Sequence, residues 1–236
     1  MTTSHAGACA TCPLPPAQAK TARDRFWKRQ GIKQTVWVVL PLTLILGWFY
    51  PVLGFGVLIC MGASIATGFF AGRAWCDVCP RGTFFDVVMR RFSANRPVPK
   101  FLRSTAFRIA MLAFLMGTMT WRLIAVWGDL PKMGMVFFTL LAVTTLVGIV
   151  LAVPLNARTW CAFCPMGSMA AWIGKRKMPL AVNNEKCTAC GLCARACPME
   201  LDPAAHRERG LMEHGDCSKC LRCTAVCPKQ ALSFEK

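Results

Sequence analysis

Twelve of the fifteen cysteines in this chain stand in four short groups. Two groups have the form C-x2-C-x2-C-x3-C-P, in residues 187–198 and 217–228. The other two have the form W-C-x2-C-P-x-G, in residues 75–82 and 160–167. Thiolates bind soft metals and iron–sulfur clusters, and thiol pairs also exchange electrons as disulfides. A secreted disulfide scaffold would be shorter and less apolar, so the pattern favours metal or redox chemistry in a reducing compartment.

The two longer groups have the spacing that binds 4Fe-4S clusters in bacterial ferredoxins. Three closely spaced thiolates hold three corners of one cube, and the fourth, which precedes proline, reaches the other cube. We therefore expect one cluster on Cys187, Cys190, Cys193 and Cys227, and a second on Cys217, Cys220, Cys223 and Cys197. Zinc is disfavoured, because zinc ligands usually come as two separated pairs.

The rest of the chain is apolar enough for membrane helices. Hydrophobic residues make up 55% of the sequence and charged residues only 17%. A membrane-spanning helix needs about 20 apolar residues. Stretches near that length predict four spans, at Gln34–Tyr50, Val52–Gly72, Phe107–Trp127 and Met133–Pro154. The links within each successive pair are short, which predicts two antiparallel hairpins.

The expected fold is therefore an α-helical membrane protein of four transmembrane helices, as two repeated hairpins, with a C-terminal α+β two-cluster ferredoxin domain. The expected divisions are an N-terminal tail at 1–33, a membrane domain at 34–174, a linker at 175–186 and the ferredoxin domain at 187–236.

The net charge of +17 also fits a membrane protein. Basic residues precede the first span, crowd the loop from Arg73 to Arg108 and follow the fourth span. Loops rich in Lys and Arg stay in the cytoplasm. This predicts a multi-pass protein of the bacterial inner membrane with both termini and the ferredoxin domain cytoplasmic. Because the basic residues flank spans, anionic lipid is the expected partner and nucleic acid is not.

The two shorter cysteine groups are copies of one unit, which consists of a hairpin, the W-C-x2-C-P-x-G motif and a short helix. A pseudo-two-fold pairing of these units would bring Cys76 and Cys79 towards Cys161 and Cys164. Three interpretations stay open. The four thiolates could hold a further iron–sulfur cluster or a single soft metal. Each pair could be a thiol–disulfide couple. The pairs could also only shape their loops.

Three cysteines fall outside these groups. Cys9 and Cys12 lie in the tail, where their spacing is either a coincidence or marks a mobile thiol pair, and they could also lend ligands to a nearby site. Cys60 falls in the middle of a span and is most simply a small buried core residue.

Taken together, the spans, the two span-terminal C-P motifs and the ferredoxin motifs resemble the NapH/NosR/CcoG-type membrane polyferredoxins. The resemblance covers about residues 34–236. It implies electron transfer between the membrane quinone pool and a redox partner, in respiration, in the maturation of reductases or in metal reduction. The membrane cysteines of those relatives are commonly spaced C-x3-C, whereas here they are C-x2-C.

The sequence thus predicts a membrane-anchored iron–sulfur electron-transfer protein, a component of an oxidoreductase system with no catalytic residue of its own. Its expected partners are lipid, a redox protein and quinone or quinol, within a hetero-oligomeric complex. The alternative is a copper reductase or an assembly factor that uses the C-x2-C pairs. The thirteen methionines, with Met166 and Met169 beside the second pair, keep copper in consideration.

Overall fold

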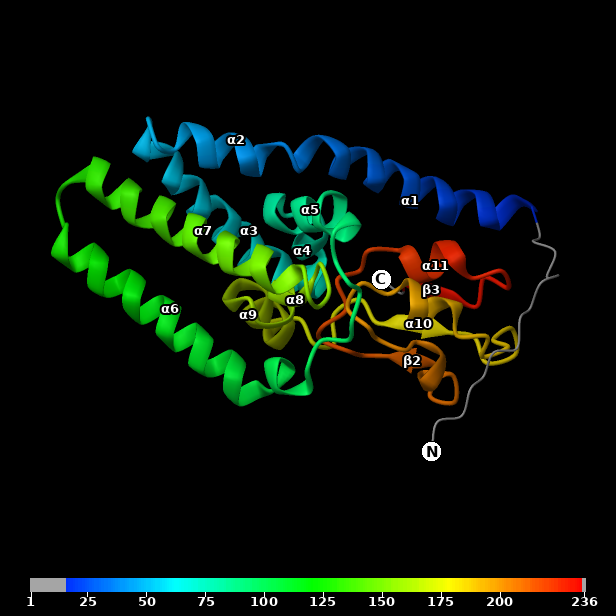
Figure 1. Ribbon diagram of the computed structural model, residues 1–236. Coiled ribbons are helices and arrows are strands. Elements are labelled where there is room, and N and C mark those ends of the chain that lie inside the picture. Colours follow the sequence, from blue (N-terminus) through cyan, green and yellow to red (C-terminus); the bar gives the residue numbers. More distant parts are fainter. Residues whose placement is uncertain (1–15, 235–236) are drawn as a thin grey trace.

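The computed structural model describes residues 16–234, which form two parts (Figure 1). The first, residues 16–173, is entirely helical and is called the helical part. The second, residues 180–234, is built around a small sheet and is called the C-terminal part. Cys9 and Cys12 lie outside the described residues.

Three helical segments are long and apolar enough to cross a membrane. The first, Pro51–Val78, joins η1 (Pro51–Phe55), α3 (Gly56–Ala71), η2 (Gly72–Ala74) and α4 (Trp75–Val78). The others are α6 (Thr105–Ala125) and α7 (Leu130–Ala152). They correspond to the second, third and fourth spans expected from sequence.

The expected first span, Gln34–Tyr50, is not a membrane-length helix. The stretch is divided between the end of α1 (Pro16–Val36) and the eight-residue α2 (Val39–Leu46), with a turn at Trp37–Val38. The expected N-terminal tail is also largely helical, because α1 begins at Pro16. Figure 1 shows α1 and α2 nearly in line, with the return into α3 at the same end of the molecule as the α6–α7 turn.

Close backbone contact joins the first and last membrane-length segments. A Cβ atom on Gly54 of η1 would collide with the Gly134 carbonyl of α7, and one on Gly134 would collide with the Pro51 carbonyl. Small residues allow helices to approach in this way where lipid offers no hydrophobic driving force. This contact holds the two hairpins together at the end opposite the cysteines.

The two W-C-x2-C-P-x-G motifs, residues 75–82 and 160–167, are called the membrane-end motifs, and a short helix begins at the proline of each, as the repeat predicts. These are α5 (Pro80–Val87), after α4, and α9 (Pro165–Ile173), after α8 (Thr159–Phe163). Between α5 and α6 the chain forms two short helical turns, η3 (Met89–Arg91) and η4 (Lys100–Arg103).

The C-terminal part is a three-stranded antiparallel sheet in the order β2-β1-β3. Its strands are β1 (Leu180–Val182), β2 (Leu211–Met212) and β3 (Leu232–Phe234). The central strand β1 falls within the expected linker at 175–186, so the sheet begins before that boundary. The helical elements here are α10 (Leu192–Ala196), η5 (Ala204–His206) and α11 (Arg222–Val226).

Candidate functional site

Local chemistry explains the Cys-Pro pair of each membrane-end motif. Cys79 and Cys164 have extended ψ angles of 133° and 128°, and each ends one short helix and precedes the next. Extended backbone is what a following proline favours, and proline suits the first helical position because it lacks the N–H that would be unpaired there. Each pair of cysteines is therefore held on a sharp turn between two helices.

The two motifs are linked by a reciprocal exchange of arginines. Arg73, which precedes the first motif, donates to the backbone carbonyl of Cys161 in the second. Arg158, at the equivalent place before the second motif, donates to the carbonyl of Cys76 at 2.8 Å. The two guanidiniums are 1% and 2% exposed. This exchange fits the pseudo-two-fold pairing expected from sequence.

The exchange also explains the glycine of W-C-x2-C-P-x-G. A Cβ atom on Gly82 would lie 2.6 Å from the Cys76 carbonyl oxygen and 3.1 Å from Arg158. On Gly167 it would lie 2.5 Å from the Arg73 guanidinium. Only a residue without a side chain leaves room for the arginine that crosses from the other motif.

The four membrane-end cysteines line one cavity of about 210 Å³. Apolar side chains of α2, α3 and α7 form much of its remaining wall, among them Leu40, Val57 and Leu141. Cys60 also lines this cavity beside Cys79, so it is not the simple core residue expected from sequence. The cavity wall thus carries these five thiols: Cys60, Cys76, Cys79, Cys161 and Cys164.

The cavity can stabilise thiolates once a metal is bound. Burial raises the pKa of Cys161 to about 11, although Arg158 opposes that shift. The hydrogen bond with Cys60 and burial together hold the pKa of Cys79 well above its ordinary value. Metal coordination deprotonates thiols outright, and the nearby Arg73 and Arg158 guanidiniums would then balance the negative charge.

Within the described part of the chain, no three His, Cys, Asp or Glu side chains are grouped closely enough to hold one metal ion. The same holds for the cysteines of the C-terminal part, whose motif is made for iron–sulfur cubes.

A buried network of charges connects this cavity to the C-terminal part. Asp77, between Cys76 and Cys79, accepts a hydrogen bond from Lys33 of α1. Lys33 also donates to Asp86 of α5 at 3.1 Å. Arg158 binds Asp86 through two nitrogens, at 2.8 and 2.6 Å. The network ends at Arg222, between Cys220 and Cys223, which lies 3.2 Å from Asp86.

The network holds more positive than negative charge. Lys33, Arg158 and Arg222 are 7% exposed or less and share the two buried carboxylates of Asp77 and Asp86. Uncompensated buried charge is costly, so the surplus needs an anionic neighbour. Iron–sulfur clusters bound by the cysteines around Asp77 and around Arg222 would provide this negative charge.

A second ion cluster attaches the C-terminal part to the membrane-length helices. Asp216 binds Arg108 of α6 through two hydrogen bonds of 2.8 Å and Arg73 through a third of 2.8 Å. Burial would raise the pKa of Asp216, but Arg108 and Arg73 lower it overall. Because Asp216 adjoins Cys217, this contact positions the start of the last cysteine group.

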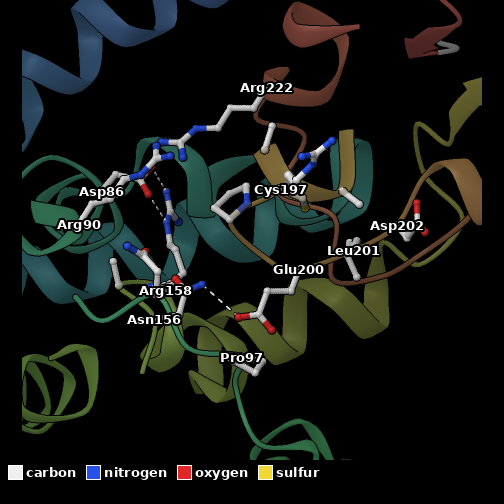
Figure 2. Close-up of a pocket in the computed structure, with 16 residues that line it drawn as sticks. Asp86, Arg90, Pro97, Asn156, Arg158, Cys197, Glu200, Leu201, Asp202 and Arg222 are labelled. Atoms are coloured by element: carbon white, nitrogen blue, oxygen red, sulfur yellow. Dashed lines mark hydrogen bonds and ion pairs between the residues drawn. The ribbon is translucent and has the colours of Figure 1, made fainter. Parts of the chain in front are cut away.

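A polar cavity of about 470 Å³ lies between the two parts (Figure 2). Asp86, Arg158 and Arg222 meet on one side of it, and Cys197 lies on the wall. Glu200 accepts a hydrogen bond from Asn156 there, at 3.0 Å. The parts therefore meet through ion pairs around a polar space, and also where Cys161 joins the buried core of the C-terminal part.

One cavity of the C-terminal part gathers cysteines from both ferredoxin motifs. This small cavity is lined by Cys187, Cys190, Cys193 and Cys227. In the other group, burial raises the pKa of Cys217 to about 11, and the Cys220 and Cys197 thiols act on it from nearby. Burial also holds the pKa of Cys223 well above its ordinary value, with Cys220, Cys217, Cys197 and Cys193 adding to the shift.

The charged residues that join these sites are not predicted from the sequence. Lys33 falls at the end of the expected tail, and the sequence identifies Arg73 and Arg158 only as basic residues that set the topology and as equivalent positions of the repeat. The available signal was the scarcity of acids, since Asp and Glu number eleven in the whole chain. Asp77 and Asp86 also have no counterpart in the second copy, where Ala162 and Ala171 stand.

Family models match both cysteine regions. A 4Fe-4S binding domain matches residues 53–99 and again 133–181, which contain the two membrane-end motifs. A 4Fe-4S dicluster domain matches residues 186–232. With the three apolar helices, these matches fit an iron–sulfur membrane protein.

Two similar proteins come from Methanocaldococcus jannaschii. Uncharacterized protein MJ0749 is 24% identical over 236 residues, which cover 86% of this chain and 85% of the relative. Uncharacterized protein MJ0750 is 29% identical over 72 residues, or 30% of this chain and 28% of the relative. No solved structure matches the chain.

Proposed function

We propose that this protein is a membrane-anchored electron carrier that connects a membrane redox partner to a second redox protein through three iron–sulfur sites. Two are the crossed cysteine groups of the C-terminal part. The third is the cavity lined by Cys76, Cys79, Cys161 and Cys164. The clusters supply one-electron redox chemistry, while the chain fixes their order and surroundings.

One observation carries this proposal. Asp77 lies inside the first membrane-end C-x2-C, and Arg222 lies inside the last C-x2-C of the C-terminal part. Both belong to the buried network centred on Asp86. A relay needs its sites held close together and apart from water, and this network joins two cysteine sites in that way.

The ligand assignment is tested by metal content. Anaerobically purified protein should contain about twelve irons and matching acid-labile sulfide per chain, against about eight for two cubes alone. Cys76→Ser or Cys161→Ser should remove the excess and spare the ferredoxin-type EPR signals. Cys60→Ser is the matched control, since it removes a thiol from the same wall that is not among the proposed ligands. Eight irons with no other metal would refute the third site and favour thiol–disulfide chemistry.

The crossed grouping has its own test. Cys197→Ser should damage the cluster held by Cys217, Cys220 and Cys223, and leave the Cys187 group intact. EPR of the reduced variant distinguishes the two. Loss of the Cys187 signal alone would show that each motif keeps its own fourth cysteine.

The membrane partner we propose is a quinone or quinol. Its support is the apolar wall that α2, α3 and α7 contribute to the four-cysteine cavity. Filling that wall with Leu141→Trp should slow reduction by a short-chain quinol at unchanged iron content. Equal rates in the variant and the native protein would place the quinone elsewhere or exclude it.

The orientation is also a proposal. The cysteine motifs and the C-terminal part lie at one end of the helices in Figure 1, and the hairpin turns lie at the other. The basic loops belong to the cysteine end, so we assign that end to the cytoplasm of a bacterial inner membrane. A periplasmic reporter fused after Lys236 should be inactive, and an active one would reverse the orientation.

One observation favours copper reduction as the alternative function. Met61 and Met166 line the same cavity as the four cysteines, so thioethers and thiols face one space. Such soft ligands suit Cu(I). Adding Cu(II) to the reduced protein should then yield Cu(I), trapped by a chelator, in amounts that fall in Met166→Leu. No dependence on Met166 would leave the relay as the better account.

A further inference from the structure

The two cysteine loops of the C-terminal part have opposite surroundings. The loop of the last group is buried, with Cys217, Ser218, Lys219 and Cys220 each 9% exposed or less. It is also bound to the helical part at both ends. Asp216 holds Arg73 and Arg108, and Arg29 of α1 donates to the Lys219 carbonyl at 2.8 Å.

The loop of the first group faces outwards. Lys186, Thr188 and Ala189 are all exposed. Within residues 16–234, no hydrogen bond or ion pair connects residues 183–195 to the helical part. The cavity that holds Cys187, Cys190, Cys193 and Cys227 therefore lies behind a loop that a soluble molecule can reach.

The exposed loop carries positive charge. Lys186 and Lys229 are exposed and line the same cavity as the four cysteines. Arg195 is exposed and donates to the Cys190 carbonyl at 3.4 Å, and it also lines the polar cavity between the two parts. Two acids lie near these three cations: Glu185, which precedes Lys186 in the chain, and the exposed Asp202, whose charge acts on Cys193. Complementary charge speeds the encounter of two proteins and orients them.

We propose that this surface, formed by Lys186, Arg195 and Lys229 around the Cys187–Cys190 loop, is the docking surface for a soluble one-electron carrier protein with an acidic face. The inference rests on the proposed relay function and adds an order to it. The buried last loop faces the membrane-end cavity, and the first loop faces the carrier. Each encounter moves one electron, so that one partner is oxidised and the other reduced, and no bond forms or breaks.

Charge reversal tests the surface directly. The reduced holoprotein in nanodiscs is mixed in a stopped-flow instrument with oxidised plastocyanin, an acidic copper protein, or with cytochrome c, a basic haem protein. Lys186→Glu combined with Lys229→Glu should lower the plastocyanin rate roughly tenfold at low salt and raise the cytochrome c rate. Salt should reduce the difference between the native protein and the variant.

The matched control is Lys175→Glu combined with Lys177→Glu. This pair makes the same change in net charge just after α9, which packs on the membrane-length helix α3. The control should leave both rates near those of the native protein. An equal loss in the two variants, or no loss in either, would overturn the docking surface.

A second readout is independent of turnover. A soluble dysprosium chelate should broaden the EPR signal of the Cys187 group more than that of the Cys217 group, because only the first loop is exposed. Equal broadening would overturn the order of the two sites. If no cluster signals exist at all, the relay function itself fails, and this outcome is distinct from a misplaced docking surface.

Discussion

The two membrane-end repeats share a backbone and differ in their charges. In both, a short helix ends at a cysteine, proline starts the next helix, and an arginine crosses to the carbonyl of the other copy. Only the first copy carries acids, Asp77 and Asp86, where the second has Ala162 and Ala171. The duplicated backbone builds one cysteine site, and the substitutions direct the contacts of each copy.

This difference gives the equivalent arginines different partners. Arg158 binds Asp86 within the helical part, whereas Arg73 reaches Asp216 in the C-terminal part. The helix of the second copy, α9, contacts α3 through small residues and not through charged ones. Gly68 lies against Ala170, and Gly72 against Gly174, so α9 packs closely on α3. One copy thus faces the ion network and the other a membrane-length helix.

The largest expected effect separates the two arginines. Arg158→Ala leaves Asp86 and Asp77 buried with less compensation, and removing one partner of a buried pair costs about 3–5 kcal/mol. Arg73→Ala should cost less, because Arg108 still holds both oxygens of Asp216. Urea unfolding in detergent measures both. Arg81→Ala, which loses a hydrogen bond to Thr144 and a cation–π contact with Trp160, is the control. A greater loss of unfolding free energy in Arg73→Ala than in Arg158→Ala would contradict the different roles assigned to the two arginines.

The next effect concerns the partner of Arg73. Asp216→Asn weakens three hydrogen bonds to arginine, and one hydrogen bond to a charged group is worth about 1.5–3 kcal/mol. The C-terminal part should then separate more easily and expose the 174–179 connector to a protease. Asp202→Asn is the control, since that exposed side chain accepts only from the Ala204 N–H. Similar cleavage rates in both variants would mean that Asp216 does not hold the two parts together.

The two glycines of the motif, Gly82 and Gly167, differ in what an added methyl group would contact. Gly82→Ala puts a methyl group against the Cys76 backbone carbonyl, which cannot move aside easily, and overpacking of this kind costs about 1–3 kcal/mol. Gly167→Ala should cost less, because its closest neighbour is the end of the Arg73 side chain. Gly117→Ala in α6 meets nothing within 4 Å and should be neutral or stabilising. Iron retention on heating ranks the three variants.

Local patterns explain what could be predicted from the sequence. Cysteine spacing located the 4Fe-4S regions that the family models match, and apolar run length located three membrane-length segments. The division at Trp37–Val38 was not visible in hydropathy. The helix α1 was missed because its polar residues show no apolar face, while its position depends on ion pairs with distant residues.

Long-range ion pairs were the main element that could not be predicted. Lys33 meets Asp86, and Arg73 meets Asp216, across 53 and 143 positions of the chain. Such pairs leave no periodic pattern in the sequence. The positions of the many basic residues are also fully explained by their preference for cytoplasmic loops. Asp77 and Asp86 were more informative, because a buried acid in a basic, apolar segment needs a cation nearby.

The smallest expected effect is one of pH on the acids of the first copy. Burial alone would raise the pKa of Asp86, but Arg158, Arg222 and Lys33 outweigh burial and hold it well below the ordinary value. A carboxyl with a lowered pKa stabilises the fold above its unfolded pKa, about 3.9 for Asp, and this contribution is lost only as the pH falls through the folded pKa. The difference in unfolding free energy between the native protein and Asp86→Asn should therefore stay constant from about pH 8 to about pH 5. The exposed-acid variant Asp202→Asn should show almost no difference over the same range. A difference that shrinks between pH 8 and 6 would mean that Asp86 titrates near neutrality, as a buried acid without cationic partners does, and that the network around the first copy is not the one described.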